Sequence, residues 1–88
     1  MIEKYIEPSE AKTLPYGGFV ELWFDINYEL HSFMGQPACI DYIKGQIQYQ
    51  AWYKKGVRHR DRDLPARIWH HSCLIADKEW YKNGNFIK

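Results

Sequence analysis

The stretch WYKKGVRHRDRDLPARI, residues 52–68, decides how this chain of 88 residues is interpreted. An aromatic pair is followed by Lys-Lys-Gly, a His-Arg pair, and a proline that begins a new apolar run. Its opening pattern returns as WYKNG at residues 80–84. A pattern that recurs at a fixed interval indicates structural repeats, which are best sought before other motifs.

The interval between proline and tryptophan also indicates a repeat. It is 15 residues in three places, Pro8 to Trp23, Pro37 to Trp52 and Pro65 to Trp80. The second and third copies match at a shift of 28, whereas the first is offset by 29 and is degenerate. We place the copies at residues 8–31, 37–59 and 65–88. The residues expected to be structural in these repeats are Trp23, Trp52, Trp80, Tyr53, Tyr81, Gly56, Gly84, His31, His59, Pro37 and Pro65.

Within each copy the sequence alternates as strands do. In QIQYQAWYK, Ile47, Tyr49, Ala51 and Tyr53 are expected on one face, with glutamines and Trp52 on the other. Lys44-Gly45, Lys55-Gly56 and Asn83-Gly84 are typical hairpin turns. Residues 54–56 are therefore predicted to be a hairpin tip, 57–59 a returning strand, and 60–64 the link to the next copy. Proline at the start of each copy is compatible with a strand's first residue.

These patterns predict an all-β fold in one small domain. The expected architecture is an antiparallel meander of about three degenerate hairpin repeats, with seven to nine short strands. A chain of this length buries a modest core. Its high aromatic content, 17 %, supplies much buried area per residue.

Charge and cysteine content narrow the class of function. The net charge is +1, which disfavours a general polyanion binder. Residues 1–31 carry six acidic against two basic side chains, and residues 32–88 carry ten basic against five acidic. No apolar run suggests a signal peptide or a membrane span, so a cytoplasmic location is expected. Cys39 and Cys73 are expected to be free thiols.

The residues Trp52, Tyr53, Gly56, His59, Arg60, Pro65 and Ala66, followed by Trp80, Tyr81, Asn83 and Gly84, carry a family resemblance. The chain resembles phage and prophage repeat proteins of the pattern Trp-Tyr-x-x-Gly-x-x-His-Arg-x-Asp-Gly-Pro-Ala, which are related to MORN-type β-hairpin repeats. Leu64 and Gln36 depart from this pattern, since they stand where the family has glycine. The resemblance implies a hairpin-repeat fold and an interaction role, and it carries no catalytic residue.

Metal and catalytic chemistry have weak support in the sequence. The soft ligands are His31, His59, His70, His71, Cys39 and Cys73. None of them forms the paired spacing typical of zinc sites, so no metal and no cofactor are predicted. Cys73 with His70 or His71 could be imagined as a nucleophile pair, but a thin meander offers no water-excluding pocket. We therefore expect a protein that is not an enzyme.

Three binding functions remain open. The candidate partner-binding residues are Lys54, Lys55, Arg58, Arg60, Arg62, Arg67 and Trp69. Trp and Arg dominate protein-binding hot spots, and Trp69 does not recur between copies, so we predict contact with another protein. The resemblance suggests a host complex, for example one inhibited by a phage-encoded protein in the host cytoplasm. The alternative is a nucleic-acid-binding module that uses the same basic and aromatic residues. A homodimer formed through a sheet edge is a further option.

Overall fold

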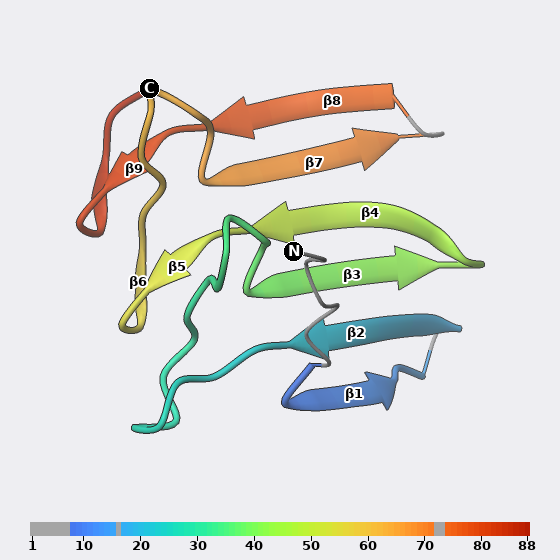
Figure 1. Ribbon diagram of the computed structural model, residues 1–88. Coiled ribbons are helices and arrows are strands. Elements are labelled where there is room, and N and C mark those ends of the chain that lie inside the picture. The colour runs from blue at the N-terminus through green and yellow to red at the C-terminus, as the bar shows by residue number, and fades with distance from the viewer. Residues whose placement is uncertain (1–7, 16, 72–73) are drawn as a thin grey trace, which may run out of the picture.

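The computed structural model describes residues 8–15, 17–71 and 74–88. Ten strands and no helix are present in these ranges (Figure 1). The strands are β1 (Glu10–Thr13), β2 (Gly18–Leu22), β3 (Cys39–Ile43), β4 (Gln46–Ala51), β5 (Tyr53–Lys54), β6 (Val57–Arg58), β7 (Arg67–His71), β8 (Leu74–Glu79), β9 (Tyr81–Lys82) and β10 (Asn85–Phe86). None of these residues belongs to a helix that could span a bilayer.

The strands form one six-stranded sheet in the order β1-β2-β3-β4-β7-β8 and two small hairpins, β5-β6 and β9-β10. Every pairing is antiparallel. The all-β prediction of antiparallel hairpin repeats is confirmed. The strands number ten rather than seven to nine, because the short strands on both sides of each small hairpin are separate elements.

Tight turns close the hairpins as the glycine pattern predicts. Lys44-Gly45, Lys55-Gly56 and Asn83-Gly84 all have positive φ at both central positions, with values from 48° to 86°. This backbone twist matches the twist of paired strands, and glycine adopts it without steric cost. The predicted tip at residues 54–56 is therefore the turn between β5 and β6.

A bulge breaks the strict alternation expected for β4. Tyr49 lies opposite Asp41, whereas the next pair joins Ile47 to Tyr42. Gln48 therefore has no opposite residue on β3. Residues directly opposite each other share a face, so Ile47 and Tyr49 lie on opposite faces. The prediction that they share one face is wrong. The bulge itself repeats, because Ala76 is left over in the same way between β7 and β8, 28 residues later.

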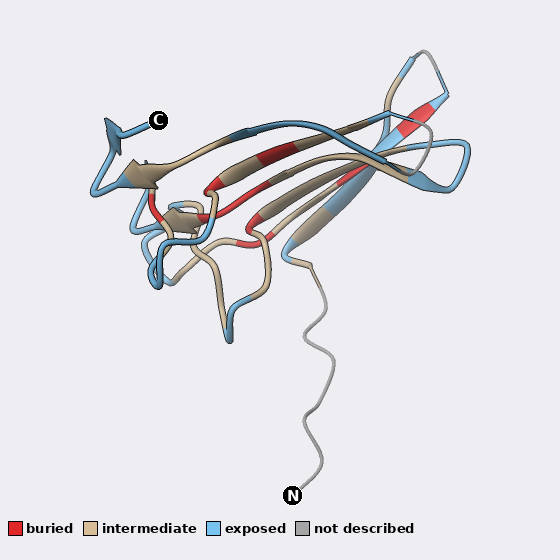
Figure 2. Cartoon of the chain, turned by 90° about the horizontal axis from the view of Figure 1, so that it is seen from above, coloured by how far each residue is buried: buried red, intermediate tan, exposed pale blue. Residues whose placement is uncertain are grey.

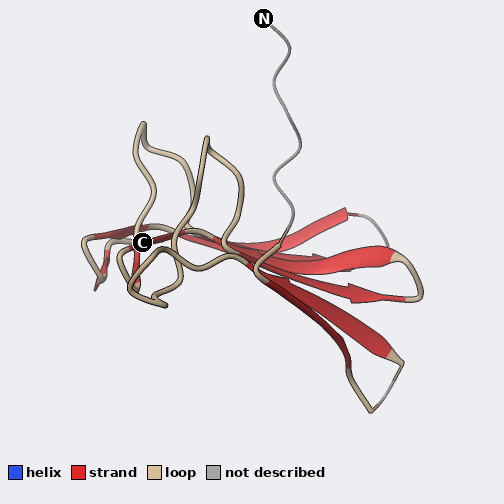
Figure 3. Ribbon diagram, turned by 60° about the horizontal axis from the view of Figure 1, so that its bottom comes forward, coloured by secondary structure: helices blue, strands red, loops and turns tan. Residues whose placement is uncertain are grey.

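Among residues 8–15, 17–71 and 74–88, no second layer of strands or helices packs against the six-stranded sheet. Each of its strands makes its principal contacts with its neighbours in the sheet. Figure 3 shows the strands as a single twisted layer with loops rising from one side. Both faces of such a sheet keep partly exposed side chains, so large residues on them are available for contact.

The core lies mainly where the strands leave the sheet for the small hairpins (Figure 2). The buried residues there include three alanines of zero exposure and the first two repeat tryptophans: Ala38, Ala51, Ala66, Trp23 and Trp52. Small side chains let the backbones approach closely, and the indole rings fill the remaining space. The third repeat tryptophan, Trp80, is half-buried and lies beneath Lys78 and Lys88.

Equivalent hydrogen bonds connect successive copies. The indole Nε1 of Trp52 donates to Gly35 O at 2.9 Å, and that of Trp80 donates to Asp63 O at 3.1 Å. Both acceptors lie 17 residues before their tryptophan. Trp52 and Trp80 therefore occupy corresponding environments, as a repeat requires.

The first copy closes its hairpin differently. Phe24 and Leu30 form a single bridge instead of a pair of strands. The carboxylate of Asp25 accepts hydrogen bonds from the amides of Asn27 and Glu29, which is an Asx-type turn. The extra residue in this copy is thereby accommodated without a glycine at the turn.

Candidate functional site

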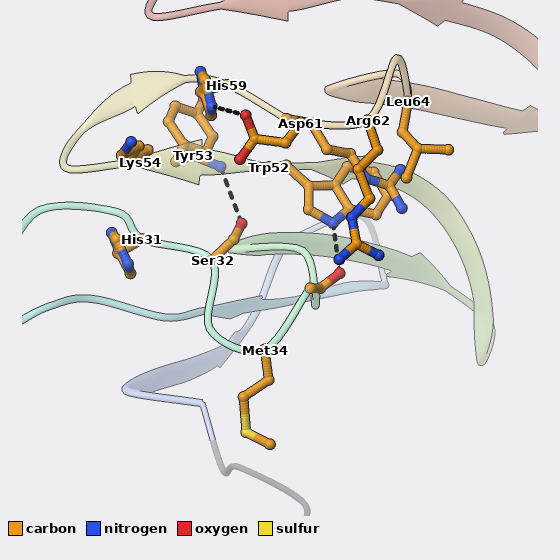
Figure 4. Close-up of a pocket in the computed structure, with 12 residues that line it drawn as sticks. His31, Ser32, Met34, Trp52, Tyr53, Lys54, His59, Asp61, Arg62 and Leu64 are labelled. Carbon is orange, nitrogen blue, oxygen red and sulfur yellow. Dashed lines mark hydrogen bonds and ion pairs between the residues drawn. The ribbon is translucent and has the colours of Figure 1, made fainter.

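A groove of about 510 Å³ lies between the loops that link consecutive copies (Figure 4). Residues of the first loop form one wall, residues of the second loop form the other, and the start of the β5 hairpin forms the floor. The lining residues are His31, Ser32, Met34, Gly35, Trp52, Tyr53, Lys54, His59, Arg60, Asp61, Arg62 and Leu64. The groove is therefore a product of repetition, since its walls are corresponding segments of two copies.

Trp52 and Arg60 form the centre of this groove. The Arg60 guanidinium lies 3.7 Å from the centroid of the Trp52 ring, a cation–π contact. Its Nη1 donates to Pro65 O at 3.0 Å. Because the indole is itself held by its bond to Gly35, the Arg60 side chain is fixed at both its face and one edge. Desolvation by burial lowers the pKa of Arg60.

His59 supports the second wall and has a defined tautomer. Its Nδ1 accepts the backbone N–H of Asn83 at 2.9 Å, so the proton of the neutral ring lies on Nε2. Nε2 then donates to the Asp61 carboxylate, also at 2.9 Å. The hydrogen bond from His59 holds the pKa of Asp61 below its usual value. The Asp61 carboxylate thus already accepts a hydrogen bond within the second wall.

His31 occupies the corresponding position on the first wall. Its Nδ1 accepts the backbone N–H of Lys55 at 3.1 Å, 24 residues along the chain, the same separation as for His59 and Asn83. Ser32 adds a bond from its own loop, because its Oγ accepts the Tyr53 amide at 3.0 Å. Both histidines therefore tie a link loop to the turn of the following hairpin.

The cations of the groove lack acidic partners in the part of the chain that the structure describes. Ion pairs in those residues join His59 to Asp61, Arg67 to Glu79 and Lys88 to Asp63. Lys54 and Arg62 are exposed, whereas Arg60 is half-buried. None of these three cations forms an ion pair among the described residues, although Lys54 lies close enough to Asp61 to help His59 lower the pKa of that carboxyl.

A second cluster lies on one face of the sheet. Trp69 on β7 is directly opposite Tyr49 on β4, with ring centroids 5.4 Å apart. Arg67 lies over both rings, at 4.5 Å from Trp69 and 5.4 Å from Tyr49. Its Nε donates to the Tyr49 hydroxyl at 2.8 Å, and its Nη1 pairs with Glu79 at 3.3 Å. Desolvation by burial raises the pKa of Tyr49.

This cluster continues onto the small hairpins. The Tyr81 hydroxyl donates to the same Glu79 carboxylate at 3.1 Å. Arg58 lies over the Tyr81 ring at 5.4 Å, and its buried Nε has no hydrogen-bond partner among the described atoms. We call Tyr49, Arg58, Arg67, Trp69 and Tyr81 the sheet patch.

The structure divides the seven predicted partner-binding residues between these places. Lys54, Arg60 and Arg62 line the groove, and Arg58, Arg67 and Trp69 belong to the sheet patch. Lys55 lies exposed at the β5–β6 turn. Tyr49 and Tyr81 of the patch and Met34 of the groove are not among the predicted partner-binding residues. Alternation along β4 placed Tyr49 on a face, but nothing in the sequence showed that Arg67 would cover it.

Cys39 and His70, two of the groups considered for chemistry, interact with neighbouring side chains. Burial, followed by the nearby Asp41 carboxylate, raises the pKa of the Cys39 thiol to about 12, so it is protonated and a poor nucleophile. His70 contacts the Gln50 side chain at 2.9 Å. Cys73 lies outside the described residues. Across 8–15, 17–71 and 74–88, no three acidic, histidine or cysteine side chains are grouped as metal ligands.

The free edge of the sheet at β8 carries exposed charges. Asp77, Lys78 and the half-buried Glu79 follow one another along it, next to the bulge at Ala76. Charges and bulges of this kind discourage edge-to-edge pairing. The sheet-edge homodimer stays a prediction, and the groove and the sheet patch are the better candidate contact surfaces.

Comparison of the chain with family models, with curated proteins and with solved structures finds no match. The function is therefore inferred from the groove and the sheet patch themselves.

Proposed function

We propose that this protein is a non-enzymatic binding protein that docks onto another protein through the sheet patch. The observation that supports this most is the cluster of Trp69, Tyr49 and Arg67 on a sheet face that no second layer of described strands covers. Tyr, Trp and Arg are the residue types that dominate protein-binding hot spots. Their mutual contacts also hold them in place before binding, which reduces the entropy lost on association.

The composition of the patch favours a protein over a nucleic acid. Glu79 borders the patch, bonded to both Arg67 and Tyr81, and would repel a phosphate backbone. Arg67 lies over the rings of Tyr49 and Trp69, so it competes with bases for the same aromatic surface. Nucleic-acid binding is the alternative, and its affinity would fall steeply with salt.

The kind of partner is suggested only by the resemblance to phage and prophage repeat proteins. On that basis the partner is a host protein complex in the cytoplasm, and the protein inhibits it by occupying a surface. An inhibitor of a host defence complex is one example of this class.

The test is an affinity purification from a bacterial lysate with three baits: the unaltered chain, Trp69→Ala and Phe19→Ala. Phe19 is a matched control because it is an exposed aromatic residue on the opposite face of the same sheet. We expect one protein to be retained by the unaltered chain and by Phe19→Ala, and to be lost from Trp69→Ala. Equal recovery by the two variants would exclude the sheet patch as the docking surface. Recovery that disappears after nuclease treatment would support the nucleic-acid alternative.

A further inference from the structure

The groove contains a half-buried cation with no counter-charge. Arg60 uses one N–H for Pro65 O, and its face is occupied by Trp52. A guanidinium has five N–H donors in total, so several are available to a ligand. Burial of its charge is not offset by any carboxylate among the described residues. Such a group gains from an anion placed beside it.

The surroundings of Arg60 also favour an anionic ligand. Arg62 and Lys54 add two exposed positive charges along the groove, and Figure 4 shows both side chains among those that border it. Asp61 is the acidic residue of the lining, and its carboxylate is bonded to His59. Opposite charges that meet in a partly desolvated groove attract more strongly than they do in bulk water.

Apolar side chains flank these charges. Met34 is 62 % exposed and Leu64 is 41 % exposed, on opposite link loops. Large apolar side chains at the rim of a charged groove are suited to contact with aliphatic side chains. The groove thus combines donors for an anion with contact area for apolar groups.

We propose that the groove binds an acidic peptide segment of a partner protein, with a Glu or Asp carboxylate bonded to Arg60 and Arg62 and aliphatic side chains against Leu64 and Met34. Arginine recognises carboxylates by paired N–H···O bonds, and the contact with Trp52 presents the Arg60 donors in a fixed orientation. This site is separate from the sheet patch, so an experiment can exclude binding at one of them without excluding binding at the other.

A peptide fits this groove better than a nucleic acid does. The Trp52 ring is 5 % exposed and its face is covered by Arg60, so it offers no stacking platform for a base. The three cations border one groove, whereas binding of a strand without sequence preference needs a track of charges along the backbone. Binding of a nucleic acid in the groove is therefore tested beside binding of the peptide.

The probe is the labelled hexapeptide Glu-Glu-Leu-Glu-Glu-Leu, compared with its Gln-Gln-Leu-Gln-Gln-Leu analogue at about 0.15 M salt. Binding is measured by fluorescence anisotropy and by the indole N–H signal of Trp52 in a nuclear magnetic resonance spectrum. We expect the acidic peptide to shift that signal and Arg62→Ala to weaken binding about tenfold. Lys44→Ala is the control, because it removes the same charge from the exposed β3–β4 turn, and it should change affinity by less than about twofold.

Arg60→Lys keeps the charge but not the planar donors, and it should weaken binding as much as Arg62→Ala. An unchanged spectrum away from the groove shows that each variant is folded. Equal binding of the two peptides would overturn the proposal, as would equal losses in Arg62→Ala and Lys44→Ala. No shift of the Trp52 signal at about 5 mM acidic peptide would do so too. A shift caused by a ten-nucleotide single strand but not by the peptide would replace it with nucleic-acid binding.

Discussion

Replacing His59 tests the idea that histidine couples one copy to the next. The ring is 7 % exposed, and its Nδ1 accepts the Asn83 amide across the boundary between the second and third copies. In His59→Ala, loss of this bond costs about 1 kcal/mol. Loss of the buried ring and the space it leaves cost about 1 to 2 kcal/mol more. The bond to the exposed Asp61 contributes little.

We therefore expect His59→Ala to lower the free energy of unfolding by about 2 to 3 kcal/mol. For a domain of this length, the corresponding decrease in Tm is about 10 to 20 °C. The measurement is urea unfolding followed by tryptophan fluorescence, with thermal unfolding as a second probe. His31→Ala should cost less, because His31 is only half-buried and its bond to Lys55 is longer.

Two amide variants separate the hydrogen bond from the burial of the ring. The side-chain oxygen of His59→Asn can occupy the place of Nδ1, so this variant should recover about 1 kcal/mol relative to alanine. His59→Gln carries its amide near the place of Nε2, where it can reach Asp61 but not Asn83. If glutamine stabilised the fold as well as asparagine, the bond to Asn83 would not be what joins the copies.

Further predictions concern turns, the buried thiol and pH. Gly84 and Gly45 both have positive φ, but a Cβ at Gly84 would lie 3.4 Å from Val57 and one at Gly45 would meet nothing. Because 3.4 Å is an ordinary van der Waals contact, Gly84→Ala and Gly45→Ala should each cost about 1 to 2 kcal/mol for the left-handed backbone alone. A much larger loss for Gly84→Ala in chemical unfolding would contradict this. In a Cys73→Ser background, Cys39 should react with iodoacetamide on the order of a thousandfold more slowly than a free thiol, since its pKa rises from 9.0 to about 12. Fast labelling of the folded protein would refute its burial. The lowered pKa of Asp61 means that its contribution to stability is present above its unfolded pKa of 3.8 and is lost as pH falls through the folded value. Asp61→Asn should therefore flatten the fall in stability between about pH 4 and pH 2 slightly, and a steeper fall in this variant would contradict the direction of the Asp61 pKa shift.

Local patterns were enough to predict the fold. The alternation within each copy and the three glycine turns depend on residues close in sequence, and the 28-residue shift shows that these local patterns recur. The structure has antiparallel hairpins with turns at the expected places. The bulges at Gln48 and Ala76 were missed, because an extra residue in one strand is visible only against its partner strand.

The two candidate sites could be predicted only in part. Composition selected arginines near aromatic residues, but it treated Arg60 and Arg67 as one surface. Arg60 lies over Trp52 in the groove, whereas Arg67 lies over Trp69 on the sheet. Side chains of neighbouring strands and loops meet by register and loop path, which depend on contacts between residues far apart in the chain.

The sequence by itself determined the repeat unit, its strands and its turns, because strand alternation and turn chemistry act over a few residues. The tertiary structure decided which charges form ion pairs and which do not among the described residues. Asp61 bonds to His59 and Glu79 to Arg67, while Arg60 is half-buried without a carboxylate among the described residues. Pairing and burial of a charge depend on the distance between groups in space, and that distance is fixed only when the copies stack.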